Sequence, residues 1–122
     1  MIVNKRRIYK VVWKIRALEQ LEDLKINDAE IERIEDEVYQ ILSIDPYGKL
    51  EPKHRKLKYN IKKLRGNFEG QWRLRIKEFH KDLAITDYRI IYEIVEDEVI
   101  VNIFKFEHRA TAYEDEDFWD KW

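Results

Sequence analysis

The 122-residue chain contains no cysteine, only 3 glycines and 2 prolines, and no long apolar run. Without cysteine it can form no disulfide scaffold, no thiolate zinc site and no cysteine nucleophile. The scarcity of glycine and proline, together with 44% hydrophobic and 40% charged residues, indicates a compact fold and excludes a linker or a disordered tail. The length leaves room for one domain with a single core.

The uncharged apolar stretches, such as residues 90–92, are far shorter than the roughly 18 residues that a membrane span needs. The basic residues after Met1 lack the apolar segment of a secretion signal. Glycine-rich phosphate loops and a nucleophile elbow are also missing. We therefore expect a cytoplasmic protein that uses no membrane, metal or small-molecule cofactor.

Charge is divided unevenly along the chain. Residues 19–45 carry ten acids against Lys25 and Arg33, a net of −8, whereas residues 49–89 carry thirteen Lys or Arg against five acids, a net of +8. This asymmetry has two interpretations. The second half presents an electropositive surface to a polyanion, or the charges of the segments neutralise one another in the fold.

The first 45 residues predict one strand and two helices. Residues 8–13 are β-branched and aromatic, as in a strand, and apolar residues at 17, 18, 21 and 24 predict a short helix. Asn27 is the expected N-cap of a second helix over about 28–43, with Glu30 as its capping-box partner and Pro46 beyond its end.

The second half predicts a sheet. Residues 45–59 lack periodicity and predict a long basic loop that opens with a turn at 45–48. From about residue 60 the period is two, with strands over 72–77, 87–94 and 99–106 and a turn at 96–97. This order predicts an α+β fold, an antiparallel sheet of four or five strands packed against two N-terminal helices.

Arg73, Arg75 and Lys77 alternate with the apolar residues of one predicted strand, so they share one face of the sheet. Arg89 lies opposite the apolar set of the next predicted strand, and antiparallel pairing brings it to that same face. Several cations on one face repel one another unless anions lie among them. The pattern fits a phosphate-binding platform or a solvated outer face.

Histidine is the usual acid or base near neutral pH, and His108 is the strongest of three candidates because Arg109 follows it and Tyr113 lies nearby. His54 and His80 are weaker candidates. None of the three has the paired spacing of a metal site.

Several short motifs occur in a characteristic order. They are Tyr9 to Trp13 before the first helix, Asp45-Pro46 after the second, Lys63-Leu64-Arg65-Gly66, Trp72-Arg73-Leu74-Arg75, Asp87-Tyr88-Arg89-Ile90-Ile91-Tyr92-Glu93, and His108-Arg109 with Tyr113. Over about residues 8–113 the chain resembles the RelE/ParE superfamily of toxins. We therefore expect one toxin domain over 1–113 and an acidic, aromatic tail over 114–122.

The resemblance implies a type II toxin that enters the ribosomal A site and cuts mRNA, and that a cognate RelB-like antitoxin holds inactive. Its protein and RNA partners are thus the antitoxin, the ribosome and mRNA. By position, the resemblance implies the catalytic residues Arg73, Arg75, Arg89, Arg109, Tyr113 and His108. It also implies the RNA-binding residues Lys62, Lys63, Arg65 and Lys77.

In the implied reaction the 2′-OH attacks the adjacent phosphate, guanidinium groups stabilise the developing charge, and a 2′,3′-cyclic phosphate results. The general base stays open between Tyr113, His108 and a lysine of the basic loop. Two other functions stay open as well: a ParE-like inhibitor of DNA gyrase that cuts nothing, and a non-toxic homologue that acts as a binding partner.

The chain departs from the family pattern in three places. Residues 76–86 separate Arg75 from Asp87, more than a short turn, which predicts an extended hairpin. Leu83 and Ile85 fall on the face of Arg89 by simple alternation, so the register of Arg89 stays open between strict alternation and an intervening bulge or twist. The tail 114–122, with five acids and one lysine, either folds back on the basic face as an RNA mimic or is a solvated terminus.

Overall fold

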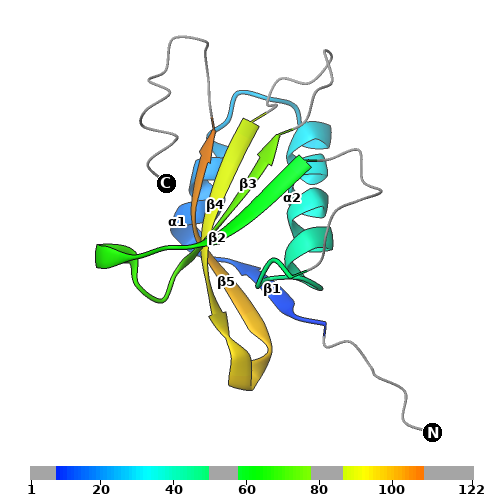
Figure 1. Ribbon diagram of the computed structural model, residues 1–122. Helices are drawn as coiled ribbons and strands as arrows, with labels where there is room; N and C mark the ends of the chain where they lie inside the picture. Colours follow the sequence, from blue (N-terminus) through cyan, green and yellow to red (C-terminus); the bar gives the residue numbers. More distant parts are fainter. Residues whose placement is uncertain (1–7, 50–57, 78–86, 109–122) are drawn as a thin grey trace, which may run out of the picture.

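A computed structural model describes residues 8–49, 58–77 and 87–108 and has an α+β architecture (Figure 1). The elements in chain order are β1 (Lys10–Trp13), α1 (Ile15–Glu22), α2 (Asp28–Leu42), β2 (Lys58–Lys63), the 3₁₀ turn η1 (Gly66–Phe68), β3 (Trp72–Lys77), β4 (Asp87–Val95), the 3₁₀ turn η2 (Glu96–Glu98) and β5 (Ile100–His108). The predicted fold class, α+β with two N-terminal helices packed against a sheet of four or five strands, is confirmed, and the sheet has five strands.

The strand order is β1-β5-β4-β3-β2, and four of the strands form the predicted antiparallel arrangement. β1 is the difference, because it pairs parallel with β5, with Lys10 opposite Ile100 and Trp13 opposite Ile103. Short turns impose antiparallel pairing on their strands, but no turn joins β1 to β5. The sheet is therefore mixed.

β2 is a second difference from the prediction, because the loop expected over residues 45–59 overlaps the first two residues of this strand. β2 pairs antiparallel with β3 along its whole length, from Lys58 opposite Lys77 to Lys63 opposite Trp72. Only Tyr59 and Ile61 pack against the core, so the strand carries two apolar residues between charged and polar ones. Such a short alternation is a weak sequence signal.

The second helix, α2, begins as expected. Asn27 Oδ1 accepts a hydrogen bond from the Glu30 backbone N–H at 2.8 Å, which is the predicted N-cap of α2. α2 ends at Leu42, and the turn that follows closes with a hydrogen bond from Gly48 N to Asp45 O at 3.1 Å.

α1 and α2 both lie on one face of the sheet, behind it in the view of Figure 1. The core between them and the sheet contains, from the helices, Ala17, Leu21, Ile34, Val38, Ile41 and Leu42, and from the strands, Leu74, Ile76, Tyr88, Ile90, Tyr92, Val101, Ile103 and Phe106. The alternate strand residues project from the opposite face, which we call the outer face: Asn60, Lys62, Arg73, Arg75, Lys77, Asp87, Arg89, Lys105 and Glu107. Among the described helices, none is long and apolar enough to cross a membrane.

Candidate active site

Three arginines share the outer face. Arg75 on β3 lies directly opposite Arg89 on β4, and Arg73, two residues before Arg75, lies opposite Ile91. Directly opposed residues project to the same side of a sheet, so the three guanidinium groups lie together as alternation predicted. The bulge lies elsewhere, between β4 and β5 at Ile91/Tyr92.

Asp87 fixes the orientation of Arg75. Arg75 donates from Nε to Asp87 Oδ1 at 3.2 Å and from Nη2 to Asp87 Oδ2 at 3.0 Å, a bidentate pair. Lys77 is the cross-strand neighbour of Asp87, but this carboxylate binds Arg75 instead. Among the described residues, Lys77 therefore has no ion-pair partner.

Glu107 on β5 neutralises Arg89, its direct cross-strand neighbour. Arg89 Nη2 donates to Glu107 Oε2 at 2.9 Å, and Lys105 Nζ lies 2.6 Å from Glu107 Oε1. Arg89 is only 1% exposed. Burial lowers its pKa to about 10, against the opposing effect of Glu107.

Arg73 has no carboxylate partner among the described residues, although it is only 7% exposed. Its Nη2 donates to Asn60 Oδ1 on β2, and its buried Nε has no hydrogen-bond partner in the described part of the chain. Burial and the neighbouring Arg75 both lower its pKa. Arg73 and Arg89 are thus not part of a solvated face, which excludes that interpretation for these two residues.

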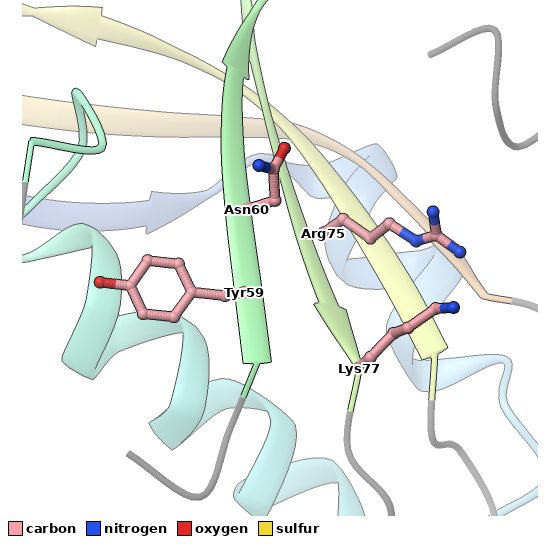
Figure 2. Close-up of a pocket in the computed structure, with 4 residues that line it drawn as sticks. All are labelled: Tyr59, Asn60, Arg75 and Lys77. Atoms are coloured by element: carbon pink, nitrogen blue, oxygen red, sulfur yellow. The ribbon is translucent and has the colours of Figure 1, made fainter. Parts of the chain in front are cut away.

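A pocket of about 220 Å³ opens beside these residues and is lined by Tyr59, Asn60, Arg75 and Lys77 (Figure 2). In Figure 2, Arg75 and Lys77 leave β3 toward the same side, whereas the Tyr59 ring leaves β2 in the other direction, toward α2. The Tyr59 hydroxyl there donates to Asp45 Oδ2 at 3.4 Å. The polar side chains of the pocket are therefore Asn60, Arg75 and Lys77.

The other predicted RNA-binding residues are divided between the two faces. Lys62 is exposed and lies opposite Arg73 on the outer face. Lys63 lies opposite Trp72, with its Nζ 6.0 Å from the centre of the Trp72 ring, on the helix side of the sheet. Arg65 is exposed between β2 and η1.

His108 does not join the arginines. It lies opposite Tyr88, and its ring centre is 6.3 Å from that of Phe106, so its side chain projects from the helix side of the sheet. Arg109, Tyr113, His54 and His80, the hairpin over 78–86 and the tail over 114–122 lie outside the described residues. The predicted catalytic residues that the structure brings together are thus Arg73, Arg75 and Arg89.

Sequence reasoning missed Asn60, Lys105 and Glu107. Asn60 belongs to the strand that the sequence signal hardly indicates, although it stands two residues before Lys62 in the period of two. Lys105 and Glu107 alternate with Phe106 near the end of β5, and this alternation could have placed them on the outer face.

This arrangement suits binding of an oxyanion. Carboxylates orient the guanidinium groups of Arg75 and Arg89. The buried guanidinium of Arg73 is held by an amide oxygen, which is uncharged and leaves the positive charge of Arg73 uncompensated. Hydrogen-bond donors that are fixed before the ligand arrives stabilise a phosphate strongly where water is excluded. Within the described ranges, no group of three His, Asp or Glu residues could hold a metal ion.

Comparisons with known proteins agree with this fold. A family model for the ParE toxin of the type II toxin–antitoxin system parDE matches residues 11–113. The toxin–antitoxin complex RelBE2 from Mycobacterium tuberculosis has a chain that is 22% identical, with 89% of this chain and 100% of that chain covered and a TM-score of 0.58. A chain of the archaeal RelE–RelB complex from Pyrococcus horikoshii OT3 is 23% identical, with coverages of 86% and 99% and a TM-score of 0.51.

No curated protein sequence matches the chain. The family match, however, covers most of it, and the structures have the same two-helix, mixed-sheet fold. The chain therefore belongs to the ParE toxin family of type II toxin–antitoxin systems, within the RelE/ParE superfamily.

Proposed function

We propose that this toxin is an endoribonuclease that cuts mRNA on the ribosome, with Arg73 stabilising the charge that develops on the scissile phosphate. The observation that carries the proposal is the state of Arg73, a buried guanidinium without a carboxylate partner among the described residues. Burying an uncompensated cation opposes folding by several kcal/mol. A phosphate oxygen that docks there supplies the missing charge.

In the proposed reaction, the ribose 2′-OH loses its proton and attacks the adjacent phosphorus. The bond from phosphorus to the 5′ oxygen then breaks, and that oxygen gains a proton. Negative charge accumulates on the phosphorane oxygens in between, where Arg73 donates to it. Asp87 and Glu107 hold Arg75 and Arg89 in fixed orientations beside Arg73.

The two proton transfers need a base and an acid. On the outer face, the described carboxylates Asp87 and Glu107 are both bound to arginines, and His108 projects from the other face. We therefore assign proton transfer to Tyr113, which also stacks on a base, or to a lysine of the basic loop. Arg109, which follows β5 in the sequence, adds a further guanidinium for the phosphate.

The partners follow from the same proposal. Two of the structural neighbours come from toxin–antitoxin complexes, RelBE2 and RelE–RelB. By analogy, a RelB-like antitoxin binds this toxin in the cytoplasm and blocks its access to the ribosome and mRNA.

The test is to map mRNA 5′ ends by primer extension after induction of the protein. Arg73→Met keeps an unbranched apolar stem of similar length to that of arginine and removes the guanidinium charge, and Lys25→Gln removes a charge from the exposed connection between α1 and α2. We expect cuts inside translated codons, a decrease of about 10²- to 10³-fold with Arg73→Met, and no change with Lys25→Gln. Undiminished cleavage by folded Arg73→Met would refute the mechanism.

A ParE-like inhibitor of DNA gyrase is the second candidate. Two observations favour it: the matching family model is that of the ParE toxin, and Arg75 and Arg89 already have carboxylate partners within the chain. In that case, induced cells would show DNA damage and filamentation while their mRNA stays intact.

A further inference from the structure

We propose that the pocket between β2 and β3 binds a second phosphate of the RNA strand, next to the phosphate that Arg73 contacts. The inference rests on the proposed function, because it takes single-stranded RNA as the ligand of the outer face. It adds a binding subsite that is distinct from the reacting phosphate, with Lys77 as its principal cation and Asn60 as the residue shared between the two sites.

Asn60 faces the pocket as a hydrogen-bond donor. Its amide oxygen accepts from Arg73 Nη2, and this bond fixes which end of the amide is oxygen and which is nitrogen. The opposite end, the Nδ2 amino group, is therefore the one available to a ligand. Asn60 is exposed, and it is one of the four residues that line the pocket.

Lys77 and Arg75 provide the positive charge. Lys77 is half-buried and, in the described parts of the chain, has no carboxylate partner, because Asp87 across from it binds Arg75. Arg75 uses Nε and Nη2 for Asp87 and lines the pocket beside Lys77 (Figure 2). Among the described carboxylates, Asp87 is the direct cross-strand neighbour of Lys77, and its bidentate bond to Arg75 neutralises its charge.

The polar groups that the pocket offers are thus donors: the Asn60 amino group, the Arg75 guanidinium and the Lys77 ammonium. A donor-only set of this kind selects an oxyanion and rejects a metal ion. Arg73 and Lys77 are four residues apart on one strand, roughly 13 Å between Cα atoms. The two cations therefore bind different phosphates of one strand.

The test measures the affinity for a fully 2′-O-methylated RNA oligonucleotide, which has no 2′-OH and cannot be cut, as a function of KCl concentration. For single strands, each lost phosphate contact reduces the slope of log K against log salt by about 0.7. We expect this reduction for Lys77→Gln and an unchanged slope for Lys25→Gln, which removes the same charge from the exposed α1–α2 connection.

Asn60→Asp is the second variant. A carboxylate at this position pairs with Arg73 and repels phosphate from both sites, so we expect RNA affinity to fall at least tenfold while the resistance to urea increases. A merely structural role of Asn60 predicts instead that affinity and resistance to urea decrease together, and that result would overturn the shared role of Asn60.

An unchanged salt slope for Lys77→Gln would overturn the pocket while leaving the nuclease proposal intact, provided that Arg73→Met still abolishes cleavage. An RNA affinity that depends on neither Arg73 nor Lys77, or no RNA binding by the unaltered protein at low salt, would likewise overturn the pocket. The nuclease proposal itself is overturned by undiminished cleavage by folded Arg73→Met. Weaker binding of an acidic protein partner by Lys77→Gln, without any change in RNA binding, would assign the pocket to that partner and refute the proposal.

Discussion

Glu107 binds two cations of the outer face at once. Its Oε2 accepts a hydrogen bond from Arg89 at 2.9 Å, and its Oε1 lies 2.6 Å from Lys105 Nζ. The pair with Arg89 is shielded from water because the Arg89 side chain is 1% exposed, whereas the Lys105 side chain is 44% exposed. Most of the stabilisation therefore comes from Arg89.

Replacing Glu107 by glutamine should lower the free energy of unfolding by about 3 kcal/mol, because it leaves a buried guanidinium without its counter-charge. Urea unfolding at pH 7 measures this change. Glu98→Gln is the matched control, an exposed carboxylate in η2, and should change stability by less than about 0.5 kcal/mol. Equal effects of the two substitutions would contradict the proposed strength of the Arg89–Glu107 pair.

Arg73→Met should have the opposite effect on stability. The substitution removes a buried cation that lacks a carboxylate partner among the described residues, so we expect the free energy of unfolding to rise by about 1 kcal/mol while function is lost. Arg16→Met, on the exposed side of α1, should leave stability within about 0.5 kcal/mol. A large loss of stability in urea unfolding of Arg73→Met would show that Arg73 is a structural residue.

Substitutions at two glycines can distinguish the cost of backbone strain from the cost of a steric clash. Gly48 and Gly66 have nearly the same positive φ, +68° and +69°, but a Cβ at Gly48 would lie 2.8 Å from Ile61 Cβ, whereas a Cβ at Gly66 would meet nothing within 4 Å. Gly66→Ala should therefore destabilise by about 1 kcal/mol. Gly48→Ala should destabilise by a further 1–3 kcal/mol or so, because the loop must move away from β2. Thermal unfolding of both variants tests this, and equal losses would show that the Ile61 contact relaxes without strain.

Glu35 lies among other acidic residues of the helices and makes the stability of the protein depend on pH. Burial raises its pKa, and Asp36, Glu32 and Glu22 raise it further. The folded protein therefore binds this proton more tightly than the unfolded chain. The ionised carboxylate thus opposes folding above its folded pKa, and this effect disappears below the ordinary value of 4.5.

Glu35→Gln should accordingly raise the free energy of unfolding at pH 7 by less than about 1 kcal/mol, since solvent and salt screen the repulsion. At pH 4 the gain should be smaller, and 1 M NaCl should reduce it at pH 7. Denaturant unfolding at the two pH values gives the comparison, with Glu69→Gln at the exposed tip beside η1 as the control. A gain that is larger at pH 4 than at pH 7 would contradict the direction of the shift.

The sequence predicted those parts of the fold that local patterns encode. The Asn27 cap, the apolar stripe of α2 and the alternation of β3 and β4 each act over a few residues, and the structure confirms all three. The parallel pairing of β1 with β5 connects segments about ninety residues apart, and no local pattern determines its direction.

The candidate site follows the same division. Alternation placed Arg73, Arg75 and Arg89 on one face, but their hydrogen-bond partners come from other strands and depend on register. Glu107 reaches Arg89 from β5, and Asn60 reaches Arg73 from β2, a strand with only two apolar residues. The side on which His108 lies also depends on register, because the β-bulge at Ile91/Tyr92 shifts the pairing of β5 with β4.

The position of β5 has a consequence for how the protein matures. β5 is the last of the described strands along the chain, yet it lies inside the sheet, between β1 and β4, and it carries the carboxylate that holds Arg89. While the chain is being synthesised, β1 lacks its partner strand and Arg89 lacks Glu107 until β5 has been made. A nascent toxin therefore cannot complete this sheet or fix Arg89 before residue 108 has been added, and the slow formation of such distant contacts delays activity further.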